Sequence, residues 1–509
     1  MKTYYVGIDV GSSSVKTSIF DARKGKSIGR AVFPAQEQII DAPNPGWAEQ
    51  DPEMWWEHFK AGYTQIIRDH KIPLDDIAGF GISYQMHGLV ALDSHGNVLR
   101  KSIIWCDSRA EDIGSEAFNA IGQRTCLASL LNSPGNFTAS KLSWVKTHEP
   151  KIYAQIHKFM LPGDYIAFRL TGEMTTTASG LSEAILWDFP NREISTQVLN
   201  HFGIDKKLVP DLVPTLGHQG TLSRETALEL GLPPGVTVTY RAGDQPNNAF
   251  SLNVLEPGQV AATAGTSGVV YAVSDQDVYD ERSRINTFLH VNDRSISKRN
   301  GILICVNGTG ILYSWLKRLF NQTPGSVSYE QMNAHAQQIS AGADGLQVYP
   351  FGNGSERLLE GRHVQASIEQ LDFNRHHAGH LIRAGMEGII FSLNLGFDLL
   401  GTYGVPLQSI RAGHSNMFLS PTFRSIFATV TNTEVRIFDT DGADGAARGA
   451  ALGAGFYDDA SQAFESLKLI DTVEPDHALT NQYFDLYSGW KEVLDTAIHE
   501  LDRNHTNLL

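Results

Sequence analysis

The stretch Tyr4–Phe20, YYVGIDVGSSSVKTSIF, carries the strongest indication of the fold. Two runs that favour β-strands, Tyr4–Val10 and Val15–Phe20, flank the turn GSSS at residues 11–14 and predict a hairpin. The small side chains of this turn let backbone N–H groups approach an anion closely, so the turn can hold phosphate. Asp9 lies beside the turn, where a carboxylate is better explained as a water-mediated ligand of a nucleotide's Mg²⁺ than as a phosphate contact. An ordinary hairpin with a Gly-Ser turn is the alternative.

A second stretch repeats this pattern almost halfway along the chain. Gln259–Val273, QVAATAGTSGVVYAV, again places two apolar runs around a turn of small residues, at positions 265–268. At 509 residues the chain is also longer than one hydrophobic core usually supports. We therefore predict an α/β protein of two related domains, residues 1–252 and 253–509. This plan resembles the ATPases that include actin, the heat-shock chaperone ATPases and the sugar kinases, whose ribonuclease H-like domains bind ATP in the cleft between them.

The composition is that of an ordinary globular protein, with 42% hydrophobic and 19% charged residues. The net charge of −15 and the lack of a basic run argue against binding to nucleic acid or to an anionic membrane. Cys106, Cys126 and Cys305 form no CxxC pair, so neither a disulfide framework nor a thiolate zinc site is predicted. Because the sequence shows no leader and no apolar run of about 18 residues, we expect a cytoplasmic protein.

The segment Ala42–Trp56, APNPGWAEQDPEMWW, combines an irregular run with the start of a helix. We expect the helix to begin near Pro52, with Asp51 as its N-cap. The two adjacent tryptophans at positions 55 and 56 are expected to pack between this helix and the sheet. The residues expected to face a cleft instead are Trp47, Glu49 and Gln50.

Polar side chains follow the short apolar strand predicted at Ile77–Ser83. Gln85 and His87 come directly after it, with Met86 between them. Strand ends that face a cleft are where open α/β folds place ligand-binding residues. A neutral histidine and a glutamine each donate and accept hydrogen bonds, which suits recognition of vicinal hydroxyl groups. A lone buried histidine at a strand end is the alternative.

Two further strand ends carry carboxylates. Ile103–Arg109, IIWCDSR, brings Asp107 to one of them, with a surface ion pair between Asp107 and Arg109 as the alternative to ligand binding. Val238–Ala249, VTYRAGDQPNNA, passes from a strand into a helix at Asp244. A carboxylate projecting from a strand end can act as a general base. Asp is also a favoured N-cap residue, so a helix cap is the alternative for Asp244.

Segments of the second half have the composition of a nucleotide site. Gly301–Trp315 passes from a strand to a helix through the turn NGTG at residues 307–310. Ile410–Asn416, IRAGHSN, supplies a glycine turn, and Asp439–Gly455 is predicted to be a helix of small residues. A flat purine needs backbone that approaches without intervening side chains, which favours adenosine contact. Close packing of backbone against backbone is the alternative.

In order along the whole chain, the elements GIDVGSSSVK, GWAEQDPEMWW, YQMHGLVALD, IIWCDSR, FTASKLSWVKTHEP, LPGDYIAFRLTGE, GDQPNNA and GTSGVV resemble the FGGY family of carbohydrate kinases. The resemblance implies ATP-dependent phosphorylation of a sugar, with Mg²⁺ and with Asp244 as the catalytic base. WAEQDPEMWW and QMHG are most similar to the elements of members that convert D-xylulose to D-xylulose 5-phosphate. The alternatives are a kinase for ribulose, fuculose, gluconate or glycerol, and an actin-like ATPase that is not a kinase.

The resemblance also implies which residues contact the ligands. Those expected to contact the sugar are Gln85, Met86, His87, Asp107, Asp244 and Gln245. Those expected to contact the nucleotide are Gly11, Ser12, Ser13, Lys16, Gly265, Thr266, Ser267, Gly308, Gly413, His414 and Asn416. Asp9 is the expected metal ligand. The expected partners are the sugar and ATP, without nucleic acid or membrane, and a homodimer is allowed.

Overall fold

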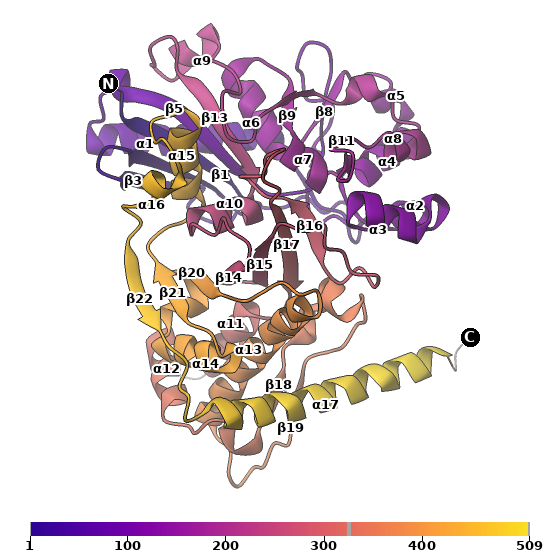
Figure 1. The fold of residues 1–509 in the computed structure, drawn as a ribbon, viewed down its shortest axis with the longest axis vertical. Helices are drawn as coiled ribbons and strands as arrows, with labels where there is room; N and C mark the ends of the chain where they lie inside the picture. The colour runs from indigo at the N-terminus through magenta and orange to yellow at the C-terminus, as the bar shows by residue number, and fades with distance from the viewer. Residues whose placement is uncertain (1, 323–326, 507–509) are drawn as a thin grey trace.

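The computed structural model describes residues 2–322 and 327–506, which form two α/β halves around two separate large sheets (Figure 1). In Figure 1 the first half lies at the top, in indigo to magenta, and the second half lies below it, in salmon to yellow. The chain therefore has the mixed α/β, two-part organisation that the repeated hairpin predicts.

The first large sheet has the strand order β13-β5-β1-β2-β3. Its strands are β1 (Tyr4–Val10), β2 (Val15–Asp21), β3 (Lys26–Phe33), β5 (Ile77–Tyr84) and β13 (Thr237–Gly243). The first predicted hairpin is confirmed, because β1 and β2 pair antiparallel over their whole length. β5 and β13 run parallel to β1, and Val10, Tyr84 and Gly243 are register partners at one edge. Residues that follow these three strands therefore meet at that edge.

The second large sheet has the strand order β16-β17-β15-β14-β20-β21-β22. Its strands are β14 (Gln259–Ala264), β15 (Gly268–Ser274), β16 (Asn286–Leu289), β17 (Asn300–Val306), β20 (Ser409–Gly413), β21 (Val435–Phe438) and β22 (Leu469–Val473). The second predicted hairpin is confirmed by the antiparallel pair β14 and β15. As in the first sheet, two parallel strands, β20 and β21, follow on the far side of the hairpin's first strand. The two halves thus share one strand plan.

Helix α15 (Gly442–Gly453) belongs to the second half of the sequence but packs on the first sheet, against β1, β2, β5 and β13. In Figure 1 it lies in gold among the strands of the first half. The approach is so close that a Cβ on Gly7 or Gly81 would overlap the carbonyl oxygens of Ala443 or Ala446. The predicted helix of small residues is present, and backbone packing against the first sheet explains its composition.

The remaining elements complete the two halves. The other helices are α1 (Pro52–His70), α2 (Glu111–Ile121), α3 (Gln123–Leu130), α4 (Thr138–His148), α5 (Pro150–Tyr153), α6 (Pro162–Thr171), α7 (Ala178–Glu183), α8 (Thr196–Phe202), α9 (Arg224–Glu229), α10 (Asp244–Ser251), α11 (Gly310–Phe320), α12 (Tyr329–Gln337), α13 (Ala378–Thr402), α14 (Pro421–Thr431), α16 (Ala460–Phe464) and α17 (Thr480–Thr506). The shorter strands are β4 (Glu49–Gln50), β6 (Val90–Leu92), β7 (Ser102–Ile103), β8 (Lys158–Met160), β9 (Thr175–Thr177), β10 (Trp187–Asp188), β11 (Glu193–Ile194), β12 (Asp211–Val213), β18 (Gln347–Tyr349) and β19 (Ser367–Glu369). As predicted, α1 begins at Pro52, and the Asp51 side chain caps it by accepting from the backbone N–H of Glu53 at 3.0 Å.

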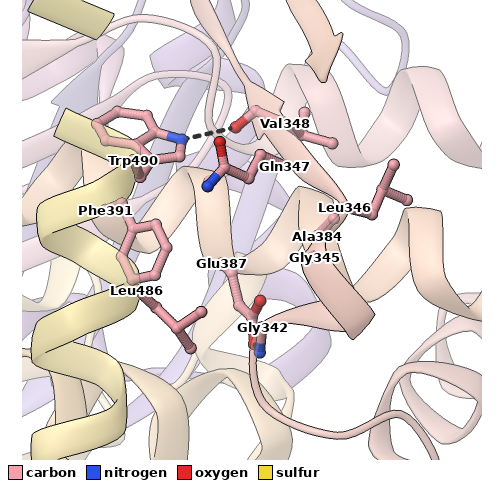
Figure 2. Close-up of a pocket in the computed structure, with 11 residues that line it drawn as sticks. Gly342, Gly345, Leu346, Gln347, Val348, Ala384, Glu387, Phe391, Leu486 and Trp490 are labelled. Carbon is pink, nitrogen blue, oxygen red and sulfur yellow. Dashed lines mark hydrogen bonds between the residues drawn. The ribbon is translucent and has the colours of Figure 1, made fainter. Parts of the chain in front are cut away.

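The long helix α17 is fixed to the second half through Trp490 and a small pocket (Figure 2). The Trp490 ring stacks on Tyr349 at 4.9 Å between centroids, and its Nε1–H donates to the carbonyl of Val348 at 3.1 Å. Glu387 of α13 lines the same pocket and accepts from the Tyr483 hydroxyl of α17 and from the backbone N–H of Gly342, both at 3.1 Å. Because both polar groups are used in holding α17 and α13 in place, this pocket serves the packing of the second half.

Candidate active site

The residues that follow the parallel strands of the first sheet meet at one edge of that sheet. Asp9, near the end of β1, accepts a hydrogen bond from Ser83 Oγ at 2.8 Å and lies 3.9 Å from Lys16 Nζ. Gly442, at the start of α15, lies so close that a Cβ there would overlap the Asp9 carboxylate. Asp9 is therefore held where the first sheet meets a segment of the second half, beside the first Gly/Ser turn.

Asp244 is the first residue of α10 and does not cap that helix. Gly243 occupies the N-cap position, and no side-chain capping bond is formed there. Burial raises the pKa of Asp244 to about 7, the negative charge of Asp9 adds to this, and hydrogen bonds from Gln245 oppose it. A carboxylate whose pKa lies near neutral pH is well matched to accepting a proton from a hydroxyl group.

His87 is held in one orientation by its backbone and by its ring. Its φ of 61° is in the left-handed region, and its Nδ1 lies 2.8 Å from the carbonyl oxygen of Glu183. Because a carbonyl only accepts, Nδ1 carries the proton and Nε2 is the accepting nitrogen. Burial lowers the pKa of His87 to about 3, so the ring is neutral at pH 7. The geometry leaves an imidazole that can accept a hydrogen bond from a hydroxyl group.

Gln50 links the first turn to the strand end that carries Gln85. Its Nε2 donates to the carbonyl of Ser12 at 2.5 Å, and its Oε1 accepts from Gln85 Nε2 and Trp55 Nε1, both at 3.0 Å. The Gln50 side chain is buried, so the expectation that it faces a cleft is wrong. Its bonds instead fix the distance between the predicted phosphate turn and the predicted sugar residues.

Asp107 lies inside the first half and not at a surface. Its carboxylate accepts from the backbone N–H of Ala48 at 2.5 Å and from Arg109 Nη2 at 2.6 Å, and both side chains are buried. The alternative of a surface ion pair is therefore wrong, because the pair is enclosed. The Arg109 guanidinium lies 3.7 Å from the Trp47 ring centroid. The bonds from Ala48 and from Arg109 Nη2 both reach Oδ2 of Asp107, and Oδ1 accepts from the backbone N–H of Arg109 at 3.0 Å and from its Nε at 2.9 Å. Both carboxylate oxygens therefore have protein partners, which gives no support to the predicted contact between Asp107 and a substrate.

Lys141 and Glu183 are buried charged residues that contact the site residues, and the sequence did not indicate either of them. Lys141 Nζ donates to the carbonyls of His87 and Ile104, both at 3.0 Å, and burial lowers its pKa to about 7. Glu183 accepts from the Tyr84 hydroxyl at 2.6 Å. Its carboxylate also lies against Gly243, since a Cβ on that glycine would be 3.0 Å from Glu183 Oε1. Burial raises the pKa of Glu183 well above its ordinary value. Lys141 in α4 and Glu183 in α7 were missed because nothing in the neighbouring sequence indicates that either charged side chain is buried.

Met86 and Gln245 complete the set at this edge. Met86 is buried, and a Cβ on Gly243 would lie 2.7 Å from its Cγ, so Met86 packs directly against the residue before Asp244. Gln245 is partly buried and hydrogen-bonds the Asp244 carboxylate. The structure therefore brings together Asp9, Gln85, Met86, His87, Asp244 and Gln245.

The second turn is fixed to the start of α11. The carbonyl of Gly265 accepts from Thr309 Oγ1 at 2.9 Å and from the backbone N–H of Gly310 at 2.7 Å. Ser267 Oγ donates to Asn307 at 3.1 Å. Gly308 has a φ of 93° and abuts the carbonyl of Pro350, so no larger residue fits there. The turn of predicted nucleotide residues, 265–267, is thus part of one rigid unit with the predicted Gly308.

The segment after β20 lies beside this second turn. The side-chain amide of Asn416 lies 3.4 Å from the place that a Cβ on Gly265 would take, and Asn416 has a φ of 52°. His414 is exposed and is anchored through its backbone N–H to the carbonyl of Phe438 at 2.8 Å. Gly413 ends β20 itself. Three segments predicted to contact the nucleotide therefore lie next to one another in the second half.

Two family models match most of the chain. Residues 4–251 match the N-terminal domain, and residues 260–457 the C-terminal domain, of the FGGY family of carbohydrate kinases. The chain belongs to the FGGY family. FGGY kinases are phosphotransferases that act on an alcohol group of a carbohydrate, and ATP is their cosubstrate.

Named relatives cover nearly the whole chain. The xylulose kinase of Bacillus subtilis is 28% identical over 98% of this chain and 100% of its own length. The xylulose kinase of Haemophilus influenzae is 30% identical over 88% of this chain and 90% of its own. The solved xylulose kinase of Rhodospirillum rubrum is 25% identical, with a TM-score of 0.86 over 98% of this chain and 99% of that one.

Other FGGY kinases share the fold as well. The solved gluconate kinase of Lactobacillus acidophilus superposes with a TM-score of 0.88 at 22% identity, over 98% of this chain and 99% of that one. At this identity the likeness concerns the fold alone.

Within the described residues, no helix is both long and apolar enough to cross a membrane.

Proposed function

We propose that this FGGY kinase transfers the γ-phosphate of ATP to D-xylulose and releases D-xylulose 5-phosphate. The observation that carries the proposal is the meeting of Asp244, Asp9 and His87 at the edge of the first sheet. The relatives named xylulose kinase, together with the QMHG element at residues 85–88, favour this ketopentose over other sugars.

Asp244 is proposed as the general base. Proton transfer to a positioned carboxylate makes the attacking oxygen of the sugar more nucleophilic as its bond to phosphorus forms. A pKa near 7 means that Asp244 is about half ionised at neutral pH and still basic enough to take the proton. Phosphoryl transfer needs little covalent chemistry from the protein, so the main work of these residues is positioning.

His87, Gln85 and Met86 are proposed to orient the sugar. The neutral ring of His87 accepts a hydrogen bond from a sugar hydroxyl through Nε2, since Nδ1–H is held by Glu183. Gln85 is fixed through Gln50 to the first turn. This linkage sets the distance between the sugar and the phosphate that it receives.

The nucleotide is proposed to lie between the two turns, at residues 11–13 and 265–267, with its adenosine beside the segment 413–416. Mg²⁺ in such sites is held by one or two carboxylates together with substrate phosphates. Asp9 fits this donor set, because its carboxylate lies beside the first turn, where Ser83 Oγ donates to it at 2.8 Å and the Lys16 ammonium lies 3.9 Å away. When bound, the ion supplies charge neutralisation on the transferring phosphoryl group. We further propose that residues 1–252 and 253–509 act as two domains that close on the ligands, with α15 moving together with the first sheet on which it packs.

A phosphorylation screen tests this proposal. Purified protein is incubated with Mg²⁺-ATP and, separately, D-xylulose, D-ribulose, L-fuculose, gluconate and glycerol, and ADP release is measured. D-Xylulose should give the highest kcat/KM. A clear preference for gluconate, whose kinase shares this fold, would replace the proposed substrate by that aldonate. Activity on no member of the panel would overturn the proposed chemistry.

A further inference from the structure

Residues of the second half reach the His87 ring, which belongs to the first half. The ring of Phe288, on the edge strand β16, lies 5.4 Å from the His87 ring, centroid to centroid. Phe137, the residue before α4, packs in an edge-to-face arrangement against the His87 ring, with 4.5 Å between the ring centroids. The aromatic wall around His87 is therefore built from both halves of the chain.

Arg357 extends this wall. It lies in the short helical turn Glu356–Leu359 of the second half, and its guanidinium carbon lies over the Phe137 ring, 5.2 Å from the centroid. Arg357 Nη1 donates to Ser133 Oγ at 2.9 Å. A Cβ on Gly135 would overlap the guanidinium, so the loop at residues 133–137 is shaped to receive this side chain. Arg357 thus ties the second half to the loop that carries Phe137.

The loop that receives Arg357 is also joined to the support of the sugar site. Asn136 donates through its side-chain amide to the carbonyl of Asp107, the residue buried against Ala48 and Arg109. Both Lys141 and Arg357 place positive charge near His87, and each helps to hold the pKa of the ring low. The positive charge of Arg357, in the second half, therefore acts on the His87 ring, which we propose binds a sugar hydroxyl.

We propose that Arg357 is a positioning residue of the second half that couples closure of the two halves to occupation of the sugar site. This inference rests on the proposed function. Bound sugar lies against His87, and Arg357 holds the loop 133–137 and Phe137 in the position that encloses it. When the halves separate, the link from Arg357 to Ser133 breaks, and the wall of the sugar site opens.

Arg357→Ala tests the coupling, with Arg357→Lys and Ser133→Ala as graded variants. Arg318→Ala is the matched control, because Arg318 is an exposed arginine of the same half that bonds only a serine of its own helix in the described contacts, Ser314 at 2.9 Å. For Arg357→Ala we expect KM for the best sugar of the panel to rise about 10-fold, the effect of losing one charge-assisted link. The KM for ATP should rise clearly less than the KM for the sugar, since the substitution changes none of the predicted nucleotide segments.

The graded variants separate positioning from folding. Arg357→Lys keeps the charge over Phe137 and should recover part of the sugar affinity, while Ser133→Ala should show a smaller loss than Arg357→Ala. Calorimetric titration of the sugar without nucleotide, and X-ray scattering with and without sugar, should show weaker binding and less compaction for Arg357→Ala.

Three results would overturn the inference. They are an unchanged sugar KM in Arg357→Ala, an equal rise of KM for sugar and ATP, and an equal effect of Arg318→Ala. Each of these leaves the proposed function intact, because that function is decided by the panel activity of the wild-type protein. The Arg357 series is measured with whichever sugar the wild-type protein phosphorylates fastest.

Discussion

The two Gly/Ser hairpins have the same strand plan but different chemistry. In the first hairpin, the second cross-strand pair from the turn is Asp9 with Lys16. The corresponding pair of the second hairpin is Thr263 with Val269. The backbone device is thus repeated, but the carboxylate is not. One turn has a carboxylate beside it, which we propose meets a metal-bound phosphate, and the other offers backbone and hydroxyl groups alone.

The surroundings of the two turns differ in the same sense. The first turn is linked through Gln50 to Gln85, and so to the strand ends that carry the residues proposed to contact the sugar. The second turn is linked to α11 and lies beside Asn416. The two halves therefore share a backbone frame, and the carboxylate and the link through Gln50 to Gln85 are found at only one of the two turns.

The largest expected effect is that of Asp244→Asn. The amide keeps the shape but cannot take the proton, so kcat should fall by about 10²–10⁴-fold while KM for the sugar stays near the wild-type value. Since the pKa of Asp244 is raised in the folded protein, its ionisation destabilises the fold as pH rises from about 4 to 7. The variant should therefore melt no lower than wild type at pH 8. Near wild-type turnover would contradict the assignment of Asp244 as the base.

Asp9→Asn and Thr263→Val compare the two hairpins directly. Loss of the Asp9 carboxylate should lower kcat by about 10–100-fold at limiting Mg²⁺ and should be partly relieved by excess Mg²⁺. Thr263→Val, at the corresponding position, should change kcat by less than about 3-fold and should not respond to metal. Titrations of rate against Mg²⁺ concentration measure both. An equal metal dependence in the two variants would remove the difference between the hairpins.

His87→Ala tests the sugar side of the first half. Removing the ring deletes one hydrogen bond to a hydroxyl, so KM for the sugar should rise about 10-fold, with KM for ATP nearly unchanged. Glu183→Gln keeps the backbone carbonyl that orients His87 and should change the sugar KM much less. Steady-state kinetics with each substrate varied in turn make the comparison. Unchanged sugar kinetics in His87→Ala would leave that ring a purely structural role.

Much of this fold could be predicted because its signals are local. The two hairpins, the strand that ends before Gln85 and the helix start at Asp51 are each written in a short run of residues. The edge at which Asp9, His87 and Asp244 meet follows from parallel strands that share one register.

What could not be predicted depends on contacts between distant segments. Asp107 ends in a buried pair because Ala48 and Trp47 close over it, which no spacing in IIWCDSR indicates. The crossing of α15 onto the first sheet pairs residues more than 400 positions apart, such as Gly7 and Ala443. Likewise, the buried Lys141 ammonium donates to the carbonyls of His87 and Ile104, which belong to segments far from it in the sequence.

The smallest expected effect is a shift in pH dependence that joins Asp9 to Asp244. Because the base must be deprotonated, kcat/KM for the sugar should rise with pH through about 7, the pKa of Asp244. The charge of Asp9 is the second cause of that raised pKa, so Asp9→Asn should move the acid limb to lower pH by about 0.5–1 unit. The measurement uses ATP far below its KM, so that the limb reports the enzyme without nucleotide. Thr263→Val, which removes no charge, should leave the limb in place. If the limbs of Asp9→Asn and wild type coincide, Asp9 does not act on the base, and the two carboxylates serve their ligands independently.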